Sequence, residues 1–339
     1  MLYATTRNRL DGYTVQHALT HAVGPDGGGW RPFHDPVFSQ EELAALKERS
    51  FNGNVAYVLN KLYDCKLTSW DVDFCIGRYP LRLKSLSNRV VLGEPWHNPR
   101  WSYSYLQQRL AELIGASTQE GWTEIAIRIA VLVGVCGEMQ QTGLLQPGEC
   151  MDVAVLSGDF SGPISAWYSR KWGLPIGSIV CCCNENNTLW NLICHGSFHT
   201  DVAPVATCVP GADITLPREL ERLVADCGSI QEMEDYLGCC HTGRTYFPDE
   251  LTLAAMRKDL FVSVVSSHRI AQTISGVYAT HKNLLAGESA LVYSGLQDYR
   301  AKKGQLRQAV VMTGMSPVLD ARFVGLALGI DPETVKDYV

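Results

Sequence analysis

The segment from residue 151 to residue 201 constrains the fold more than any other part of the chain. An apolar run, Met151–Leu156, leads into a glycine-bearing turn, and apolar side chains then recur at helical spacing from about 164 to 172. A second apolar run, Ser178–Cys183, ends in four polar residues. Strand, helix and strand in this order form a βαβ unit, which favours a parallel sheet with a right-handed crossover. We therefore predict an α/β protein.

The turn between the first strand and the helix has the sequence Ser-Gly-Asp-Phe-Ser-Gly, residues 157–162. Glycines let backbone N–H groups converge on one point, and the helix N-terminus adds partial positive charge, so such a turn is able to hold a phosphate. The same residues suit an ordinary tight βα turn, because short loops of this kind need glycine. The turn by itself leaves both alternatives open.

Composition and charge narrow the classes of function. The 339 residues are 46% hydrophobic and 19% charged, which suffices for a large core in one or two domains. A net charge of −6, without a Lys/Arg run, argues against nucleic acid or an anionic membrane as the partner. Arg128 interrupts the longest apolar stretch, Ile125–Val135, and the N-terminus lacks the apolar core of a signal peptide. We expect a cytoplasmic protein without a membrane partner.

The twelve cysteines predict neither disulfides nor a metal site. Residues 181–183 are all cysteine and lie on a predicted buried strand, where adjacent side chains point to opposite faces and suit packing better than bridging. Two further Cys/His clusters, at 194–199 and 239–241, lack the paired C-x-x-C spacing that is typical of zinc sites. We expect reduced thiols and no metal.

The central segment also resembles a known family. Its stretch SGDFSGPISAWYSRKWGLPI, followed by a strand, NENNTL and HGSF, is similar to the threonine synthase family of pyridoxal-phosphate (PLP) enzymes. In that family a strand–SGNFGD–helix–GLP segment cradles the cofactor phosphate. The resemblance implies the fold-type II PLP-enzyme fold, a parallel sheet flanked by helices. It assigns six residues of the turn to cofactor binding: Ser157, Gly158, Asp159, Phe160, Ser161 and Gly162.

The chain departs from the family pattern in three places that bear on its chemistry. Aligning the family's H-G-P-T-x-A-F-K-D segment on Pro95 puts Arg100 at the Schiff-base lysine, and a guanidinium does not form the imine. Asp159 replaces the asparagine of the phosphate turn, where a carboxylate repels a phosphate. The family's small domain, with its S-G-D-T-G loop, has no counterpart, since one helix follows another directly near 115–122. We expect this cofactor-gripping domain to be largely absent.

Other positions follow from the resemblance alone. His268 remains from a D-P-H-T-A motif, and Ser294, at the end of a strand expected just before it, matches a hydroxyl near the pyridine nitrogen of PLP. Lys302 falls near a motif lysine. We divide the chain into an N-terminal, largely helical region, residues 1–78, and a large α/β domain, residues 79–339.

These departures favour a threonine-synthase-like pseudoenzyme that has lost PLP chemistry and serves ligand binding or protein interaction without a cofactor. One alternative is an active PLP-dependent lyase of amino-acid biosynthesis, acting on a phosphorylated amino acid such as O-phosphohomoserine, with Lys84 or Lys302 reaching the cofactor. Another is a PLP-independent enzyme in which His268, Asp159 and Arg100 supply acid–base and anion-holding groups. A small-molecule ligand is compatible with each hypothesis. A homodimer is the simplest way to cover the surface left by a missing small domain.

Overall fold

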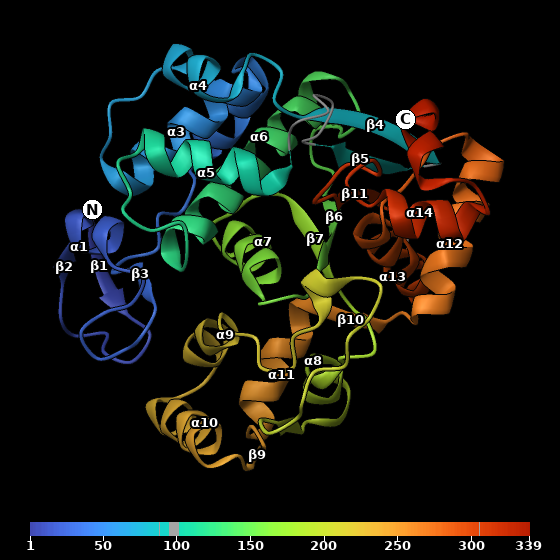
Figure 1. The fold of residues 1–339 in the computed structure, drawn as a ribbon. Coiled ribbons are helices and arrows are strands. Elements are labelled where there is room, and N and C mark those ends of the chain that lie inside the picture. The colour runs from blue at the N-terminus through green and yellow to red at the C-terminus, as the bar shows by residue number, and fades with distance from the viewer. Residues whose placement is uncertain (88, 95–101, 305) are drawn as a thin grey trace.

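The computed structural model of the chain describes residues 1–87, 89–94, 102–304 and 306–339. The main sheet consists of six strands: β4 (Arg82–Ser87), β5 (Val90–Glu94), β6 (Met151–Leu156), β7 (Ile176–Cys183), β10 (Leu260–Val264) and β11 (Gln308–Met312). Their order is β10-β7-β6-β11-β5-β4. All neighbours are parallel except β4, which runs antiparallel to β5 at one edge. The expected α/β fold with a mostly parallel sheet is confirmed (Figure 1).

The predicted βαβ unit is present at the centre of this sheet. Helix α7 (Ser161–Lys171) connects β6 to β7, which pair in parallel. The helix begins three residues earlier than the apolar pattern indicates, because Phe160 adopts a left-handed conformation with φ of 75° and turns the chain into the helix. The sequence pattern therefore located the unit correctly but missed the first helical turn and the first two residues of β7.

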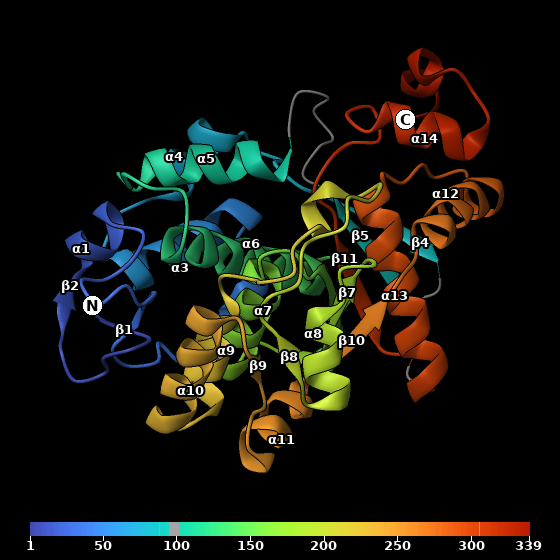
Figure 2. The ribbon, with the colours of Figure 1, turned by 60° about the horizontal axis from the view of Figure 1, so that its bottom comes forward.

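The two faces of the sheet pack on different helices. The side chain of Cys181 joins a hydrophobic cluster with α6 (Trp122–Gln141) and α7, whereas Cys182 joins a second cluster with α12 (Ser267–His281) and α13 (Gly287–Lys303). This alternation follows from the two-residue period of a strand. Figures 1 and 2 both place α6 and α7 on one side of the sheet and α12 and α13 on the other.

The N-terminal region packs against α6. It contains a small sheet, in the order β2-β1-β3, and several helices. Tyr3 and Leu59 belong to the same buried cluster as Trp122 of α6. Besides β4 and β5, the elements before α6 are β1 (Leu2–Thr5), β2 (Tyr13–Thr14), α1 (Val15–Thr20), β3 (Trp30–Pro32), α2 (Gln40–Ala44), a 3₁₀ turn (Ala45–Glu48), α3 (Phe51–Tyr63), α4 (Ser69–Ile76) and α5 (Tyr103–Leu113).

The segment between β7 and β10, and the C-terminus, complete the fold. Pro217 lies just before α9, which begins at residue 220. The remaining elements are α8 (Thr188–Trp190), a π turn (Asn191–His195), β8 (Phe198–His199), a 3₁₀ turn (Pro210–Ala212), α9 (Leu220–Cys227), α10 (Ile230–Thr242), β9 (Thr245–Tyr246), α11 (Glu250–Asp259), α14 (Ala321–Leu328) and a final 3₁₀ helix (Pro332–Tyr338).

The prediction of a strand that ends near Ser294 is wrong. Residues 287–303 form the seventeen-residue helix α13, which packs on β6, β7, β10 and β11. A short apolar run at a buried site does not distinguish strand from helix by periodicity. The strand that completes the sheet is β11, further along the chain and between β6 and β5.

The chain passes directly from α5 to α6, as the sequence indicates. The linker after Leu113 is a short turn, and α6 begins at Trp122. Within the described residues, no helix is both long enough and apolar enough to cross a bilayer. The same residues bring no three His, Cys, Asp or Glu side chains together in a metal-binding arrangement.

Candidate functional site

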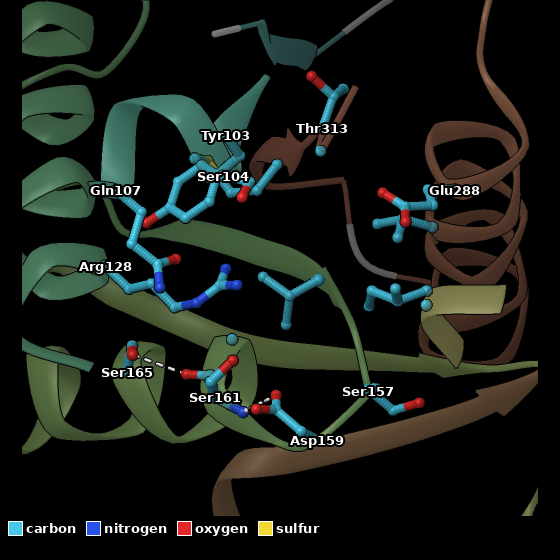
Figure 3. A pocket seen from close by; sticks show the side chains of 18 of the residues that line it. Tyr103, Ser104, Gln107, Arg128, Ser157, Asp159, Ser161, Ser165, Glu288 and Thr313 are labelled. Carbon is cyan, nitrogen blue, oxygen red and sulfur yellow. Dashed lines mark hydrogen bonds between the residues drawn. The ribbon is translucent and has the colours of Figure 1, made fainter. Parts of the chain in front are cut away.

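A cavity of about 630 Å³ lies at the carboxyl ends of β6 and β11. Its walls come from the start of α5, from α6, from the turn leading into α7, from the start of α13 and from the segment that follows β11 (Figure 3). Ligands of open α/β sheets bind at the carboxyl ends of the strands, because loops and helix N-termini converge there. This cavity is therefore the candidate site.

The turn at residues 157–162 lines the cavity with every residue except Phe160. The Phe160 side chain is fully buried in the hydrophobic core and does not line the cavity. Asp159 accepts a hydrogen bond from the Ser161 N–H at 3.0 Å, and its other carboxylate oxygen lies 3.7 Å from the Arg218 guanidinium. A carboxylate thus occupies the position at the helix N-terminus where a phosphate turn would present a free N–H.

Arg128 of α6 provides a positive charge in the cavity wall. Its guanidinium donates to Glu124 at 2.9 Å, and the Ser161 hydroxyl donates to the same carboxylate oxygen at 2.8 Å. The ring of Tyr103 lies beneath the guanidinium, 4.5 Å from its carbon. The charge of Arg128 is therefore balanced inside the wall and its side chain is held in one orientation.

Glu288, in the first turn of α13, faces the cavity from the wall opposite Arg128 (Figure 3). Burial raises the pKa of Glu288, the nearby Asp320 carboxylate raises it further, and Arg128 opposes both effects. Sequence reasoning missed Glu288, because it took the following residues for a strand. Two sequence signals favour a helix here: an acidic residue suits its first turn, and Gly304 is a typical C-terminal cap.

Thr313, directly after β11, holds the place at the strand end that Ser294 was expected to hold. Its hydroxyl donates to the carbonyl of Gly93 at 2.8 Å, and the residue lines the cavity. Ser294 lies in the middle of α13, where its hydroxyl is 2.6 Å from that of Thr273, and it is not among the lining residues. An apolar run followed by Thr-Gly was the sequence signal for this strand end.

The polar residues after β7 build a hydrogen-bonded network. Asn184 donates to the Thr207 hydroxyl at 2.8 Å and to Asp213 at 2.6 Å, and Asn186 also donates to Asp213. Asp213 in turn accepts from the Thr207 backbone at 2.8 Å. The network fixes the segment 202–214, which contributes two residues to the cavity wall.

Two of the residues expected to take part in chemistry are not placed in this cavity. Arg100 lies outside the described residues. His268 is exposed in the first turn of α12 and is not a lining residue, so it does not join Asp159 in the cavity.

The two lysines proposed to reach a cofactor also lie elsewhere. Lys84 is on β4 at the edge of the sheet, paired in register with Leu92. Lys302 is near the far end of α13, with its ammonium 5.8 Å from the Phe261 ring centre. It follows Glu288 by fourteen residues, which in a helix is about 21 Å. All ten lysines of the sequence fall within the described residues, and none lines the cavity.

Parts of the sequence are similar to curated proteins, and no family model matches the chain. Threonine synthase-like 1 of Macaca fascicularis is 20% identical over 191 residues, which is 55% of this chain and 26% of that protein. Its Homo sapiens counterpart is 23% identical over 119 residues, 35% and 16% of the two chains. Threonine synthase of Saccharomyces cerevisiae is 24% identical over 140 residues, 38% and 27%. The matched part thus spans about a quarter or less of these relatives.

Solved threonine synthases share the fold. The PLP-bound enzyme from Brucella melitensis superposes with a TM-score of 0.85 at 16% identity, over 98% of this chain and 92% of that chain. The yeast enzyme gives 0.81 at 15% identity, over 99% and 93%. Because these alignments extend over nearly all of both chains, the absence of the small domain stays a prediction. Part of the sequence is thus similar to threonine synthase and threonine synthase-like 1, and the chain shares the α/β fold of threonine synthases.

Proposed function

We propose that this threonine synthase-like protein is a pseudoenzyme that binds a small molecule in the cavity without PLP Schiff-base chemistry. One observation carries the proposal: none of the ten lysines lines the cavity. PLP enzymes of this kind need a lysine amine next to the cofactor aldehyde. Arginine does not substitute for it, because its guanidinium stays protonated.

The described residues also do not favour binding of the PLP phosphate. Asp159 takes the Ser161 N–H at the start of α7, and its charge disfavours a second anion there. Arg128 lies in the same wall but is already paired with Glu124 at 2.9 Å. The lining residues therefore do not fit PLP, either at its aldehyde or at its phosphate.

The cavity nevertheless has the properties of a ligand site. Its volume of about 630 Å³ falls in the usual range for small-molecule pockets. Both apolar and polar side chains line it, and the Asn184 network fixes one wall. An ordered cavity that lacks a cofactor lysine supports the proposal that the protein keeps the cavity to bind a ligand.

A homodimer is part of the same proposal. Helix α4 exposes Trp70 and Phe74, one helical turn apart, with 80% and 92% of their surface accessible. Large exposed apolar side chains of this kind favour a protein contact. Light scattering after size-exclusion chromatography tests this part: a dimer supports it, and a monomer at all concentrations contradicts it.

The first experiment is a visible absorbance spectrum of the purified protein with and without PLP, followed by borohydride reduction and peptide mass spectrometry. Saccharomyces cerevisiae threonine synthase, treated in parallel, is the positive control. We expect no absorbance band for a Schiff base, no stoichiometric lysine adduct and no phosphate release from O-phosphohomoserine. A single reducible lysine adduct at full occupancy would overturn the proposal and identify the lysine of an active lyase.

A further inference from the structure

We infer that the cavity takes a ligand with a primary ammonium group, for which Glu288 is the counter-ion. The inference rests on the proposed ligand-binding function and adds the chemical class of the ligand. It starts from the charges of the lining residues. Of the three lining carboxylates, Glu124 is paired with Arg128 at 2.9 Å, and Asp159 accepts from the Ser161 N–H at 3.0 Å. Glu288 is the third.

Glu288 has no hydrogen-bond or ion-pair partner among the residues that the structure describes. Asp320, the carboxylate that acts on Glu288 electrostatically, accepts instead from the Gly287 backbone at 2.6 Å. A mostly buried carboxylate without a cation is unfavourable unless something else supplies the compensation. The cavity thus has an excess of negative charge at one defined point.

The position of this carboxylate is built into the surrounding backbone. A Cβ atom at Gly211 would lie 2.7 Å from one carboxylate oxygen of Glu288, and a Cβ atom at Gly314 would lie 2.2 Å from the other. Neither glycine has a positive φ. Glycine is therefore needed here because the Glu288 carboxylate comes so close, and not because of the backbone conformation. The two glycines therefore leave a space that the Glu288 carboxylate fills.

An organic cation fits this arrangement better than a metal ion. Calcium and magnesium take six or more oxygen ligands in most sites, and the described residues offer no group of three acidic, His or Cys side chains here. An ammonium group has three donors and needs only a carboxylate and one or two further acceptors. Val292, one turn after Glu288, and Ile214 line the cavity nearby and suit an aliphatic carbon chain.

The test uses the full chain and three probes with four carbon atoms each: n-butylammonium, 1-butanol and n-butyrate. Ligand-observed NMR titration measures the affinity of each probe. We expect butylammonium to bind and the other two to bind at least tenfold more weakly. Glu288→Gln should weaken butylammonium binding at least tenfold. Gly314→Ala should weaken it as well, because the added methyl group displaces the carboxylate. Glu333→Gln, at an exposed position in the last 3₁₀ helix, is the matched control and should bind as the wild type does.

Equal binding of butanol or butyrate, or unchanged binding by Glu288→Gln, would overturn the ammonium assignment while leaving a ligand-binding cavity in place. Absence of binding by all three probes would also overturn it. The proposed function fails separately, on a PLP–lysine adduct in the absorbance and mass-spectrometric experiment, so the two failures are distinguishable. If butylammonium binds, titrations with amino acids and with diamines then separate the two natural sources of the ammonium group.

Discussion

The Oδ1 atom of Asp159 accepts a hydrogen bond from the backbone N–H of Ser161 at 3.0 Å. The side chain thereby binds its own helix N-terminus and adds a negative charge where an anion would otherwise be attracted. The turn leads from a strand into a helix N-terminus, as phosphate-binding turns do, while its electrostatics oppose phosphate.

Replacing this charge should therefore restore anion binding. We expect Asp159→Asn to bind inorganic phosphate roughly tenfold more tightly than the wild type, since one repulsive unit charge near 4 Å costs about 1 to 4 kcal/mol at the dielectric of a protein surface. Phosphorus NMR titration measures the effect. Asp337→Asn, at an exposed position near the C-terminus, is the control. Equal phosphate affinity of Asp159→Asn and the wild type would contradict this account of the turn.

Arg128 should matter for stability, because Glu124 is only 12% exposed. Arg128→Met leaves that carboxylate without its cation and should lower the free energy of unfolding by about 2 kcal/mol. The double variant with Glu124→Gln should regain at least half of the loss. Urea denaturation measures both.

The exposed ion pair of Arg109 and Glu112, 2.7 Å apart on α5, is the control for the buried pair. Arg109→Met should cost less than about 1 kcal/mol, because solvent screens an exposed ion pair. Equal losses at Arg128 and Arg109 would show that burial of Glu124 has no special weight.

Asn184 should control the order of the segment 202–214. Asn184→Ala removes the donors to Thr207 and Asp213 and leaves the half-buried Asp213 carboxylate with fewer partners, at a cost of about 2 kcal/mol. Hydrogen exchange of backbone amides in this segment should become faster, while exchange in α6 should change little. Asn184→Asp should be worse than Asn184→Ala, since it places a second carboxylate beside Asp213. Unchanged exchange in both variants would contradict the role of the network.

Glu288 should make stability depend on pH. Burial, with a contribution from Asp320, raises the pKa of Glu288 in the folded protein, so the folded state disfavours its charged form. The penalty is absent below the carboxyl pKa of the unfolded chain, about 4.3, grows as the pH rises from there to the folded pKa, and is constant above it. Glu288→Gln should therefore raise the urea midpoint at pH 8 and leave it nearly unchanged at pH 4. A gain of the same size at both pH values would exclude ionisation as the cause.

Local sequence patterns predicted the centre of the fold well. The run Met151–Leu156, the turn and the helix after it were identified because a strand, a glycine turn and a helical period follow one another without ambiguity. Helix α4, Ser69–Ile76, also begins at a local signal, because Thr68 caps it through a capping box.

The remainder depended on contacts between distant parts of the chain. Residues 289–294 have strand-like composition, yet they form part of α13, since a helix that lies across four strands is apolar on much of its surface. The Glu288 carboxylate lies close to Gly211 and Gly314, and nothing in the local sequences of these three segments predicts that they meet. The site could therefore be located from the turn at residues 157–162, whereas its unpaired carboxylate could not.

The place of β11 between β6 and β5 has a consequence for how the chain is made. Residues 308–312 pair with strands that precede them by roughly 150 to 220 positions, and loop closure over such distances slows folding. Until the ribosome has made residues 308–312, β5 and β6 each have an edge without its neighbour, and unpaired edges invite association with other chains. The nascent protein is therefore exposed to aggregation at these two edges until β11 has been made, and a chaperone that shields strand edges would help it during that interval.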